Sequence, residues 1–201
     1  MNNSVTSVAV FCGSSDGKDA KYCQLAADFG RLCGQNKITV YYGGAKLGMM
    51  NAVAEAALSE NTAVIGIIPD FFSGDVVVAQ NITEQIWVKS MSERKQKMEQ
   101  LADAFVILPG SFGTMDELFE VVTDAQLGLH RKPIVILNAF GYYDLLIKQL
   151  DVFANEGFLR PFHKELISVA TSPEDVFRKL SEFSYSNDLA WLEKHTLHSK
   201  R

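Results

Sequence analysis

The sequence lacks the features of several large protein classes. Among its 201 residues, Lys and Arg number 19 against 24 Asp and Glu, which gives a formal net charge of −5. A general binder of nucleic acid or of anionic membranes carries a basic patch, so we expect neither partner. No apolar run approaches the roughly 20 residues that cross a bilayer, and no charged start precedes an apolar signal region. We therefore expect a cytoplasmic protein.

Cysteine and histidine are also scarce, and their spacing predicts neither a metal site nor a disulfide framework. The three cysteines are Cys12, Cys23 and Cys33. Cys23 and Cys33 fall on one predicted helix, about 15 Å apart along its axis, which is beyond the reach of a disulfide. The four histidines follow no Cys/His ligand pattern. We expect reduced thiols, no metal ion and no cofactor.

What the chain does contain is enough apolar sequence, 47% of its residues, for one full core. Short β-branched or aromatic runs alternate with longer helical patterns. The expected strands are 7–12, 39–42, 63–68, 86–88, 104–108, 134–137 and 166–169, and the expected helices are 19–35, 48–60, 92–102, 114–127, 142–156 and 173–183. This alternation predicts an α/β fold over residues 1–185: a single-domain, Rossmann-like, doubly wound parallel sheet with helices on both faces. A polar C-terminal tail over residues 186–201 follows.

The most informative segment covers residues 104–117, where an apolar run ends at Pro109-Gly110 and a helix follows Gly113. Glycines let a backbone approach a ligand closely. The first N–H groups of a helix lack internal partners and carry the positive end of its dipole. The segment therefore predicts a phosphate-binding loop. Glu117 adds a carboxylate that phosphate binding does not need, although a helix N-terminus by itself favours acids by about 0.3 to 1 kcal/mol.

A second segment, residues 90–98, predicts a helix that starts with two cations. Ser90 and Glu93 fit the N-cap and third position of a capping box. Arg94 and Lys95 then lie near the N-terminus, where the dipole disfavours cations unless an anion faces them. A guanidinium can bind a phosphate or carboxylate through two parallel hydrogen bonds, so we predict a functional role for Arg94. Lys95 also fits a solvated basic helix face.

Residues after other strands belong to the same predicted crevice, because ligands bind outside the carboxyl ends of parallel strands at a topological switch point. Cys12-Gly13-Ser14 follows the first strand and Gly43-Gly44 the second. The glycines after the second strand match neither the dinucleotide fingerprint nor a Walker loop, which disfavours dinucleotide redox chemistry and ATP hydrolysis. Residues 70–83 lack firm periodicity and are predicted to form a mobile flap over the cleft.

Taken together, residues 10–15, 41–44, 90–95 and 109–117 resemble the LONELY GUY (LOG) family. The similarity runs in order from about residue 8 to residue 158. Members of this family are cytokinin-activating phosphoribohydrolases, often mislabelled lysine decarboxylases. The resemblance implies a hydrolase that cleaves the N-glycosidic bond of a purine-type nucleoside 5'-monophosphate, either a cytokinin riboside monophosphate or AMP, to free base and ribose 5-phosphate. It also implies a homodimer with active sites near the subunit interface.

The resemblance also assigns roles by position. It makes Arg94 and Glu117 the catalytic pair. The residues that it places at the nucleotide are Lys95, Gly110, Ser111, Phe112, Gly113, Thr114, Met115, Asp116 and Thr123, with Gly13, Ser14, Gly44 and Met91 from the other segments. Ser111 departs from the family pattern, which has glycine there. It keeps its N–H and adds a hydroxyl donor, but it loses the glycine-only backbone conformations.

Two other functions compete with this interpretation. A non-catalytic carrier of a phosphorylated ligand, such as the molybdenum-cofactor carriers of related fold, would keep the glycine loops without needing Arg94 and Glu117 together. A decarboxylase that uses pyridoxal phosphate would need a Schiff-base lysine, and no lysine of the sequence stands in an identifiable context for one.

Overall fold

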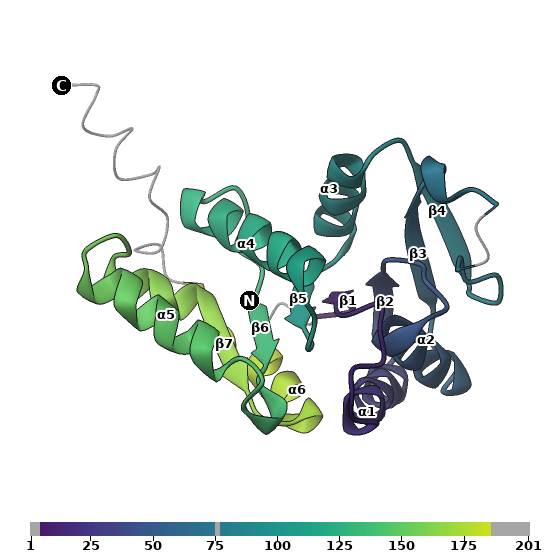
Figure 1. Ribbon diagram of the computed structural model, residues 1–201, viewed down its shortest axis with the longest axis horizontal. Coiled ribbons are helices and arrows are strands. Elements are labelled where there is room, and N and C mark those ends of the chain that lie inside the picture. The colour runs from purple at the N-terminus through teal and green to yellow at the C-terminus, as the bar shows by residue number, and fades with distance from the viewer. Residues whose placement is uncertain (1–4, 75–76, 186–201) are drawn as a thin grey trace.

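One parallel sheet organises the chain, as a computed structural model of residues 5–74 and 77–185 shows. Its seven strands lie in the order β4-β3-β2-β1-β5-β6-β7, from right to left in Figure 1. They are β1 (Ser7–Phe11), β2 (Thr39–Tyr42), β3 (Val64–Pro69), β4 (Glu84–Val88), β5 (Ala104–Ile107), β6 (Ile134–Leu137) and β7 (Ile167–Ala170). The tail predicted over residues 186–201 lies outside the described residues, as do residues 75 and 76 of the predicted flap.

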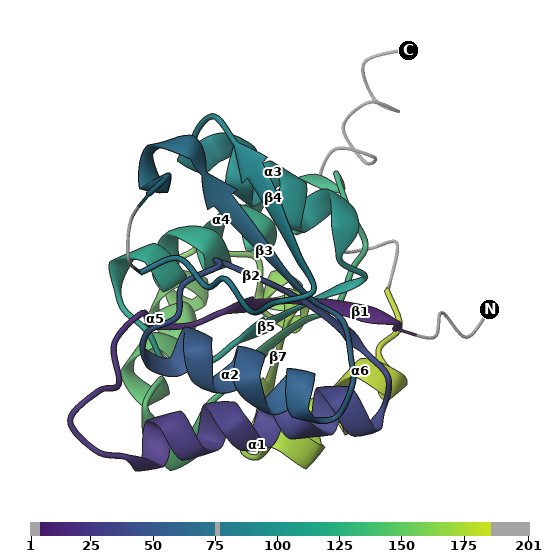
Figure 2. The ribbon, with the colours of Figure 1, turned by 90° about the vertical axis from the view of Figure 1, so that its right-hand side faces the viewer.

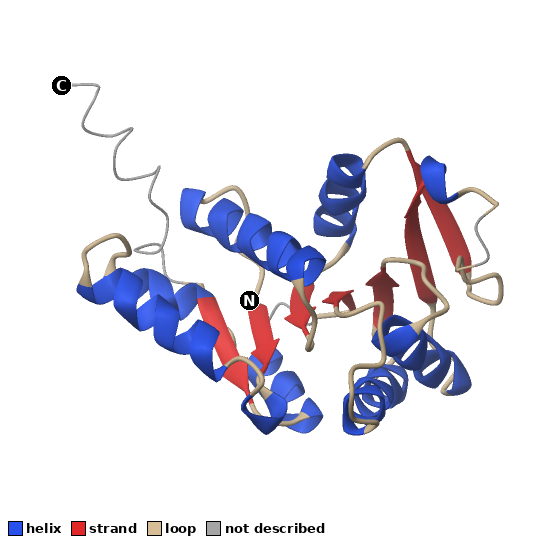
Figure 3. Cartoon of the chain, viewed as in Figure 1, coloured by secondary structure: helices blue, strands red, loops and turns tan. Residues whose placement is uncertain are grey.

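Helices cover both faces of this sheet, as Figure 3 shows in blue and Figure 2 shows from the side. One face carries α1 (Lys21–Gln35), α2 (Gly48–Ser59) and α6 (Pro173–Glu182); the other carries α3 (Met91–Leu101), α4 (Phe112–Leu127) and α5 (Asp144–Asn155). Short 3-10 helices, namely η1 (Asp70–Phe72), η2 (Ala139–Gly141) and η3 (Pro161–Leu166), lie in the connections. The predicted doubly wound α/β fold is confirmed.

The alternation of side chains along each strand divides the core between the two faces. In β1, Val8 and Val10 pack in the cluster under α1, α2 and α6, whereas Ala9 and Phe11 pack in the cluster under α3, α4 and α5. Phe11 stacks on Phe105 of the neighbouring strand with ring centroids 6.0 Å apart. Because both faces are covered, a central strand is buried along its whole length, which explains its nearly continuous apolar sequence.

The strand order creates a switch point between β1 and β5. The chain builds outward from β1 to β4 in one direction and then returns to β5 on the other side of β1. The loops after β1 and β5 meet there, since the Gly13 N–H donates to the Pro109 carbonyl oxygen at 3.0 Å. A crevice at the carboxyl ends of the strands is the expected consequence.

The helix that carries Arg94 starts as the sequence predicts. Ser90 is the N-cap of α3, and its hydroxyl accepts from the Glu93 N–H at 3.1 Å. The Glu93 carboxylate accepts from the N–H of Lys89 at 2.7 Å rather than from that of Ser90. Capping by Ser90 thus makes Met91 the first residue of α3 and places Arg94 in the first turn.

The stretch predicted to be a flap contacts the loop after β2. Val78 forms an antiparallel bridge with Ala45. The Lys46 N–H donates to the Val77 carbonyl at 2.8 Å, and the Ala79 N–H donates to the Gly44 carbonyl at 2.9 Å. The structure therefore gives residues 77–79 backbone contacts that a free flap does not have. No helix formed by the described residues is long and apolar enough to cross a membrane.

Candidate active site

A pocket of about 360 Å³ lies at the carboxyl ends of β1, β2, β3 and β5, a size typical of small-molecule sites. Its polar wall is made by Gly13, Ser14, Ser111, Gly113 and Thr114 from the loops after β1 and β5. Its apolar wall is made by Leu47, Met50, Ile68, Phe72, Val78 and Met91. Arg94 and Glu117 add two opposite charges. The pocket can therefore take a ligand with one anionic part and one largely apolar part.

The structure brings the two predicted catalytic residues together. Arg94 comes from the first turn of α3 and Glu117 from the second turn of α4, and Arg94 Nη2 lies 3.3 Å from Glu117 Oε1. Only 7% of Arg94 and 5% of Glu117 is exposed. A deeply buried charged pair is weak evidence of a role in fold stability, because apolar residues of similar volume are often equally stable. The pair is therefore the first candidate for chemistry.

Burial also shifts the protonation of the Glu117 carboxyl. Loss of solvation raises the pKa of Glu117 to about 7, against the attraction of Arg94, which lowers it; Asp116 adds a smaller upward effect. A carboxyl that titrates near neutrality suits general acid–base work.

Arg94 keeps a hydrogen-bond donor for a ligand. Its Nη1 lies 3.7 Å from the Met91 sulfur, and its Nη2 bonds Glu117. Its buried Nε has no hydrogen-bond partner among residues 5–74 and 77–185. An unpaired buried donor is costly, so a ligand that supplies an acceptor there would be stabilised.

Two glycines after β2 shape this wall. Gly44 has a φ of 76°, and a Cβ built on it would lie 2.3 Å from Ile68 Cγ1. A Cβ on Gly43 would lie 2.2 Å from Arg94 Nη2. Gly44 was predicted to touch the nucleotide and lines the pocket, whereas the sequence did not single out Gly43 as a site residue.

The N-terminus of α4 leaves donors free for an anion. Ser111 is the N-cap, but its side chain makes no capping hydrogen bond. Its φ of −122° is negative, so this position does not adopt the left-handed conformation that favours glycine. Gly110 is the constrained position, because a Cβ there would lie 2.0 Å from Thr114 Oγ1. The first N–H groups of the helix, from Phe112 onward, have no partner within it.

Several residues that the resemblance placed at the nucleotide do not line this pocket. Lys95 lies instead in a charge cluster, with its Nζ 2.9 Å from Asp116 and also paired with Glu120. Burial lowers the pKa of Lys95, but its hydrogen bonds to Glu120 and Asp116 outweigh this effect and raise it. The Thr123 hydroxyl donates to the Phe119 carbonyl at 2.6 Å.

The other three lie around the loop rather than on the pocket wall. Phe112 is 92% exposed, and Met115 packs against the core cluster under α3, α4 and α5. Gly110 lies behind Thr114. The roles predicted for these residues stay predictions.

The sequence analysis did not predict most residues of the apolar wall, nor that Cys12 borders the pocket. Leu47, Ile68 and Phe72 come from three separate elements, and no spacing links them. Cys12 was expected to be a core thiol and is 2% exposed, yet it lines the pocket. Burial raises its pKa, and nearby Glu117 raises it further, so the thiol stays protonated. Within the described ranges, no group of three or more His, Cys, Asp or Glu is placed to hold a metal ion.

Comparison of the sequence with known proteins gives close relatives. Residues 50–180 match a family model described as "Possible lysine decarboxylase". The chain is similar to the probable cytokinin riboside 5'-monophosphate phosphoribohydrolase LOGL9 of Oryza sativa subsp. japonica, with 42% identity over 88% of this chain and 78% of that protein. It is also similar to the cytokinin riboside 5'-monophosphate phosphoribohydrolase LOG7 of Arabidopsis thaliana, with 39% identity over 88% of this chain and 81% of that protein.

Solved structures share the fold at lower identity. The molybdenum cofactor binding protein of Rippkaea orientalis superposes with a TM-score of 0.66 and 19% identity over 88% of this chain and 95% of that chain. The Moco carrier protein of Chlamydomonas reinhardtii superposes with a TM-score of 0.67 and 16% identity over 89% and 97%. At such identities the likeness concerns the fold alone.

Proposed function

The chain belongs to the LONELY GUY (LOG) family, and from that membership we propose that it is a phosphoribohydrolase acting on a purine-type nucleoside 5'-monophosphate. The reaction adds water across the N-glycosidic bond and yields free base and ribose 5-phosphate. The relatives' names point to a cytokinin riboside monophosphate, and AMP is the second candidate substrate. The observation that carries the proposal is the buried pair of Arg94 and Glu117, which shares one pocket with the N-terminus of α4.

The phosphate of the substrate binds at the N-terminus of α4 in this proposal. The loop N–H groups and the hydroxyls of Ser111 and Thr114 supply donors on the pocket wall, and the helix dipole favours the negative charge. This binding energy is remote from the reacting carbon, so it serves to position the sugar. The apolar wall around Ile68 and Phe72 receives the base.

Glu117 acts on the sugar. Cleavage of the bond between C1' and the base nitrogen leaves an oxocarbenium-like ribose, which a carboxylate stabilises. The ionised Glu117 lies beside the developing cation, bonds the ribose hydroxyls and orients the water that attacks C1'. The bonding electrons leave with the base. Glu117 accepts the proton that the water loses as the new C–O bond forms, and this proton ends on the base nitrogen, which gives neutral free base and ribose 5-phosphate.

Arg94 positions Glu117 and the substrate relative to each other. Its Nη2 bonds the carboxylate, and its unpaired Nε is a donor directed to substrate oxygen or nitrogen. A guanidinium stays charged across the working pH range, so Arg94 also keeps Glu117 more ionised than burial alone would allow. It assists departure of the base through a hydrogen bond.

The competing functions fit the pocket less well. A carrier needs the glycine loops but has no need of a buried acid and guanidinium in contact. A decarboxylase that uses pyridoxal phosphate needs a lysine amine, and none of the described residues that line the pocket is lysine.

One incubation tests the proposal. Purified protein is mixed with AMP or with isopentenyladenosine monophosphate, and free base and ribose 5-phosphate are measured over time. Release of both products in equal amounts supports the hydrolase, and the ratio of the two rates identifies the preferred substrate. Binding of either nucleotide without release of base would instead favour a carrier.

We further propose that the protein is a cytoplasmic homodimer. Phe112 and Phe119 lie on one face of α4 and are 92% and 41% exposed, and such paired aromatic side chains are typical of interfaces. Cys12, Cys23 and Cys33 are all free thiols, which suits a reducing compartment. Sedimentation analysis should give a dimer that Phe112→Ser with Phe119→Ser dissociates, whereas Leu145→Ser, at a site 80% exposed on α5, should leave it intact.

A further inference from the structure

Three consecutive carbonyl oxygens in the loop after β5 each accept a hydrogen bond. Leu108 accepts from the Tyr143 hydroxyl at 2.7 Å, and Gly110 accepts from the Tyr142 hydroxyl at 2.6 Å. Between them, Pro109 accepts from the N–H of Gly13 at 3.0 Å. Two adjacent tyrosines, more than thirty residues further along the chain, therefore hold the loop that precedes α4.

The bond to Gly110 also determines where the next N–H points. In a planar trans peptide the carbonyl oxygen and the following N–H point in opposite directions. Because the Gly110 oxygen faces Tyr142, the N–H of Ser111 points away from Tyr142. Ser111 lines the pocket and Tyr142 does not, and an N–H that points away from Tyr142 can therefore face the pocket.

We propose that Tyr142 is a positioning residue for the phosphate site, with Tyr143 supporting the same loop. The Tyr142 hydroxyl keeps the peptide between Gly110 and Ser111 in the orientation that offers an N–H, rather than a carbonyl oxygen, to the phosphate. This inference rests on the proposed function, because it takes the 5'-phosphate to bind at the N-terminus of α4.

A specific device is needed because of Gly110. Glycine has little steric restriction in φ and ψ, so a peptide next to it can rotate with little penalty. The contact with Thr114 demands glycine at this position, since any Cβ would lie 2.0 Å from the Thr114 hydroxyl oxygen. The loop therefore cannot gain rigidity from a side chain at residue 110. The hydrogen bond from the Tyr142 hydroxyl to the Gly110 oxygen supplies this rigidity instead.

The tyrosines are themselves held by the turn after β6. The Asn138 side chain accepts from the Tyr143 N–H at 2.7 Å and donates to Asp144 at 2.8 Å. Phe140 has a φ of 59°, a left-handed conformation that is unfavourable for a residue with a Cβ. Backbone strain of this kind persists where the surroundings fix it, and it is frequent at functional sites.

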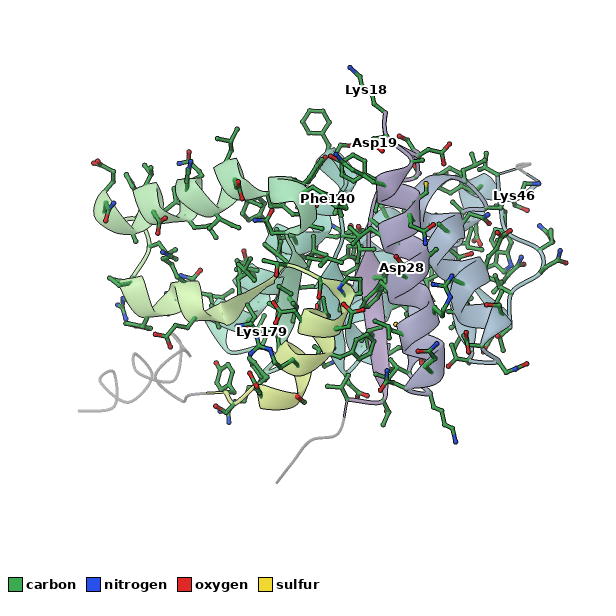
Figure 4. The ribbon with its side chains drawn as sticks, turned by 90° about the horizontal axis from the view of Figure 1, so that it is seen from below. Lys18, Asp19, Asp28, Lys46, Phe140 and Lys179 are labelled. Carbon is green, nitrogen blue, oxygen red and sulfur yellow. The ribbon has the colours of Figure 1, made fainter. Side chains whose placement is uncertain are left out.

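Aromatic packing connects this turn to the first turn of α1. The Tyr142 ring packs edge-on against Tyr22 and Tyr143, with centroids 5.7 and 4.8 Å apart. Phe140 also packs edge-on against Tyr22, with ring centroids 6.0 Å apart, and Figure 4 labels Phe140 and, in the segment before α1, Asp19. The ring of Tyr142 is thus fixed independently of its hydroxyl, so removal of the hydroxyl alone should leave the turn in place.

Tyr142→Phe tests the inference, with Tyr22→Phe as matched control. Both changes remove one hydroxyl from the same aromatic cluster, and the Tyr22 hydroxyl makes no hydrogen bond within the described part of the chain. For the full-length protein we measure the Kd of ribose 5-phosphate by calorimetry and kcat and KM for AMP. In Tyr142→Phe, Kd and KM should rise about 3- to 10-fold with kcat nearly unchanged. The affinity for adenosine, which lacks the phosphate, should stay unchanged.

Backbone NMR supplies a readout that a general structural role would not move. The amide signal of Ser111 should shift when ribose 5-phosphate binds the wild-type protein, and this shift should shrink in Tyr142→Phe but not in Tyr22→Phe. Tyr143→Phe should give a similar increase in Kd. It should also lower the thermal stability, because the buried Leu108 carbonyl oxygen loses its hydrogen bond from the Tyr143 hydroxyl.

The outcomes separate this inference from the proposed function. If the wild-type protein binds ribose 5-phosphate but releases no base from AMP or isopentenyladenosine monophosphate, the hydrolase proposal fails while the Kd comparison still tests Tyr142. Unchanged Kd in Tyr142→Phe, or an equal loss of affinity for adenosine, would overturn the positioning role. Absence of ribose 5-phosphate binding to the wild-type protein would overturn it as well.

Discussion

The guanidinium of Arg94 occupies the space that any side chain at Gly43 would need. A Cβ built on Gly43 would lie 2.2 Å from Arg94 Nη2, the atom that bonds Glu117. The glycine after β2 therefore makes room for the charged pair between α3 and α4. A residue without a side chain is therefore needed at this position for the geometry of the site.

Gly43→Ala should displace Arg94 and reduce kcat/KM at least tenfold, about 1.4 kcal/mol or more of transition-state stabilisation. A double-mutant cycle with Arg94→Ala isolates this mechanism. Because the added methyl group acts through the guanidinium, Gly43→Ala should cost little further activity once Arg94 is absent. Additive losses in the double variant would contradict this explanation.

Arg94→Ala should impair binding, turnover and stability together. It leaves the Glu117 carboxylate buried without its partner, which typically destabilises a protein by about 3 to 5 kcal/mol. Protonation of Glu117 relieves this cost, so the loss in unfolding free energy should be smaller at pH 5 than at pH 8. Urea unfolding at both pH values measures it. Lys97→Ala, which removes a cation from the same helix outside the pocket, should show neither effect.

Glu117→Gln should abolish most turnover while it leaves nucleotide binding largely intact. The amide keeps the shape of the side chain but can neither stabilise a cationic ribose nor accept a proton, so kcat should fall by about 10²- to 10⁴-fold. Glu120→Gln, one turn further along α4 and outside the pocket lining, is the matched control. Near-normal kcat in the Glu117 variant would remove this residue from the mechanism.

The pH dependence of stability should report the raised pKa of Glu117. Its pKa is about 7 in the folded protein against an ordinary value of 4.5. Between these values the folded state keeps a proton that the unfolded state releases. The contribution of Glu117 to stability is therefore fully present below about pH 4.5 and is lost as the pH rises through 7.

The difference in unfolding free energy between the wild-type protein and Glu117→Gln should thus decrease, by on the order of 3 kcal/mol, from pH 4.5 to pH 8. A pH-independent difference would contradict the shift. Turnover should instead increase as the pH rises, since the ionised carboxylate of Glu117 stabilises the ribose cation. The ratio kcat/KM, which reports the pKa values of the free enzyme, should rise through about pH 7 and then level off.

The local features of the fold follow from the amino-acid pattern. Continuous apolar runs such as residues 104–108 indicate buried parallel strands, and Ser90 with Glu93 marks the start of a helix. These features depend on contacts within a few residues, so the order of residues is sufficient to identify them. The candidate phosphate loop before α4 is predictable for the same reason, whereas the catalytic roles predicted for Arg94 and Glu117 depend on the resemblance to the LOG family.

Other properties of the site depend on the order of the strands in space. The contact between Arg94 and Glu117 exists because α3 and α4 pack on the same face beside the switch point. The raised pKa of Glu117 comes from burial by neighbouring elements. The close approach of Gly43 to Arg94 brings together the loop after β2 and the first turn of α3, which are about fifty residues apart in the sequence. Tyr142 reaches Gly110 from the turn after β6. The distances, burial and protonation at the site depend on residues that are far apart in the sequence. A linear pattern therefore does not reveal them, because only the packing of the helices on the sheet brings these residues together.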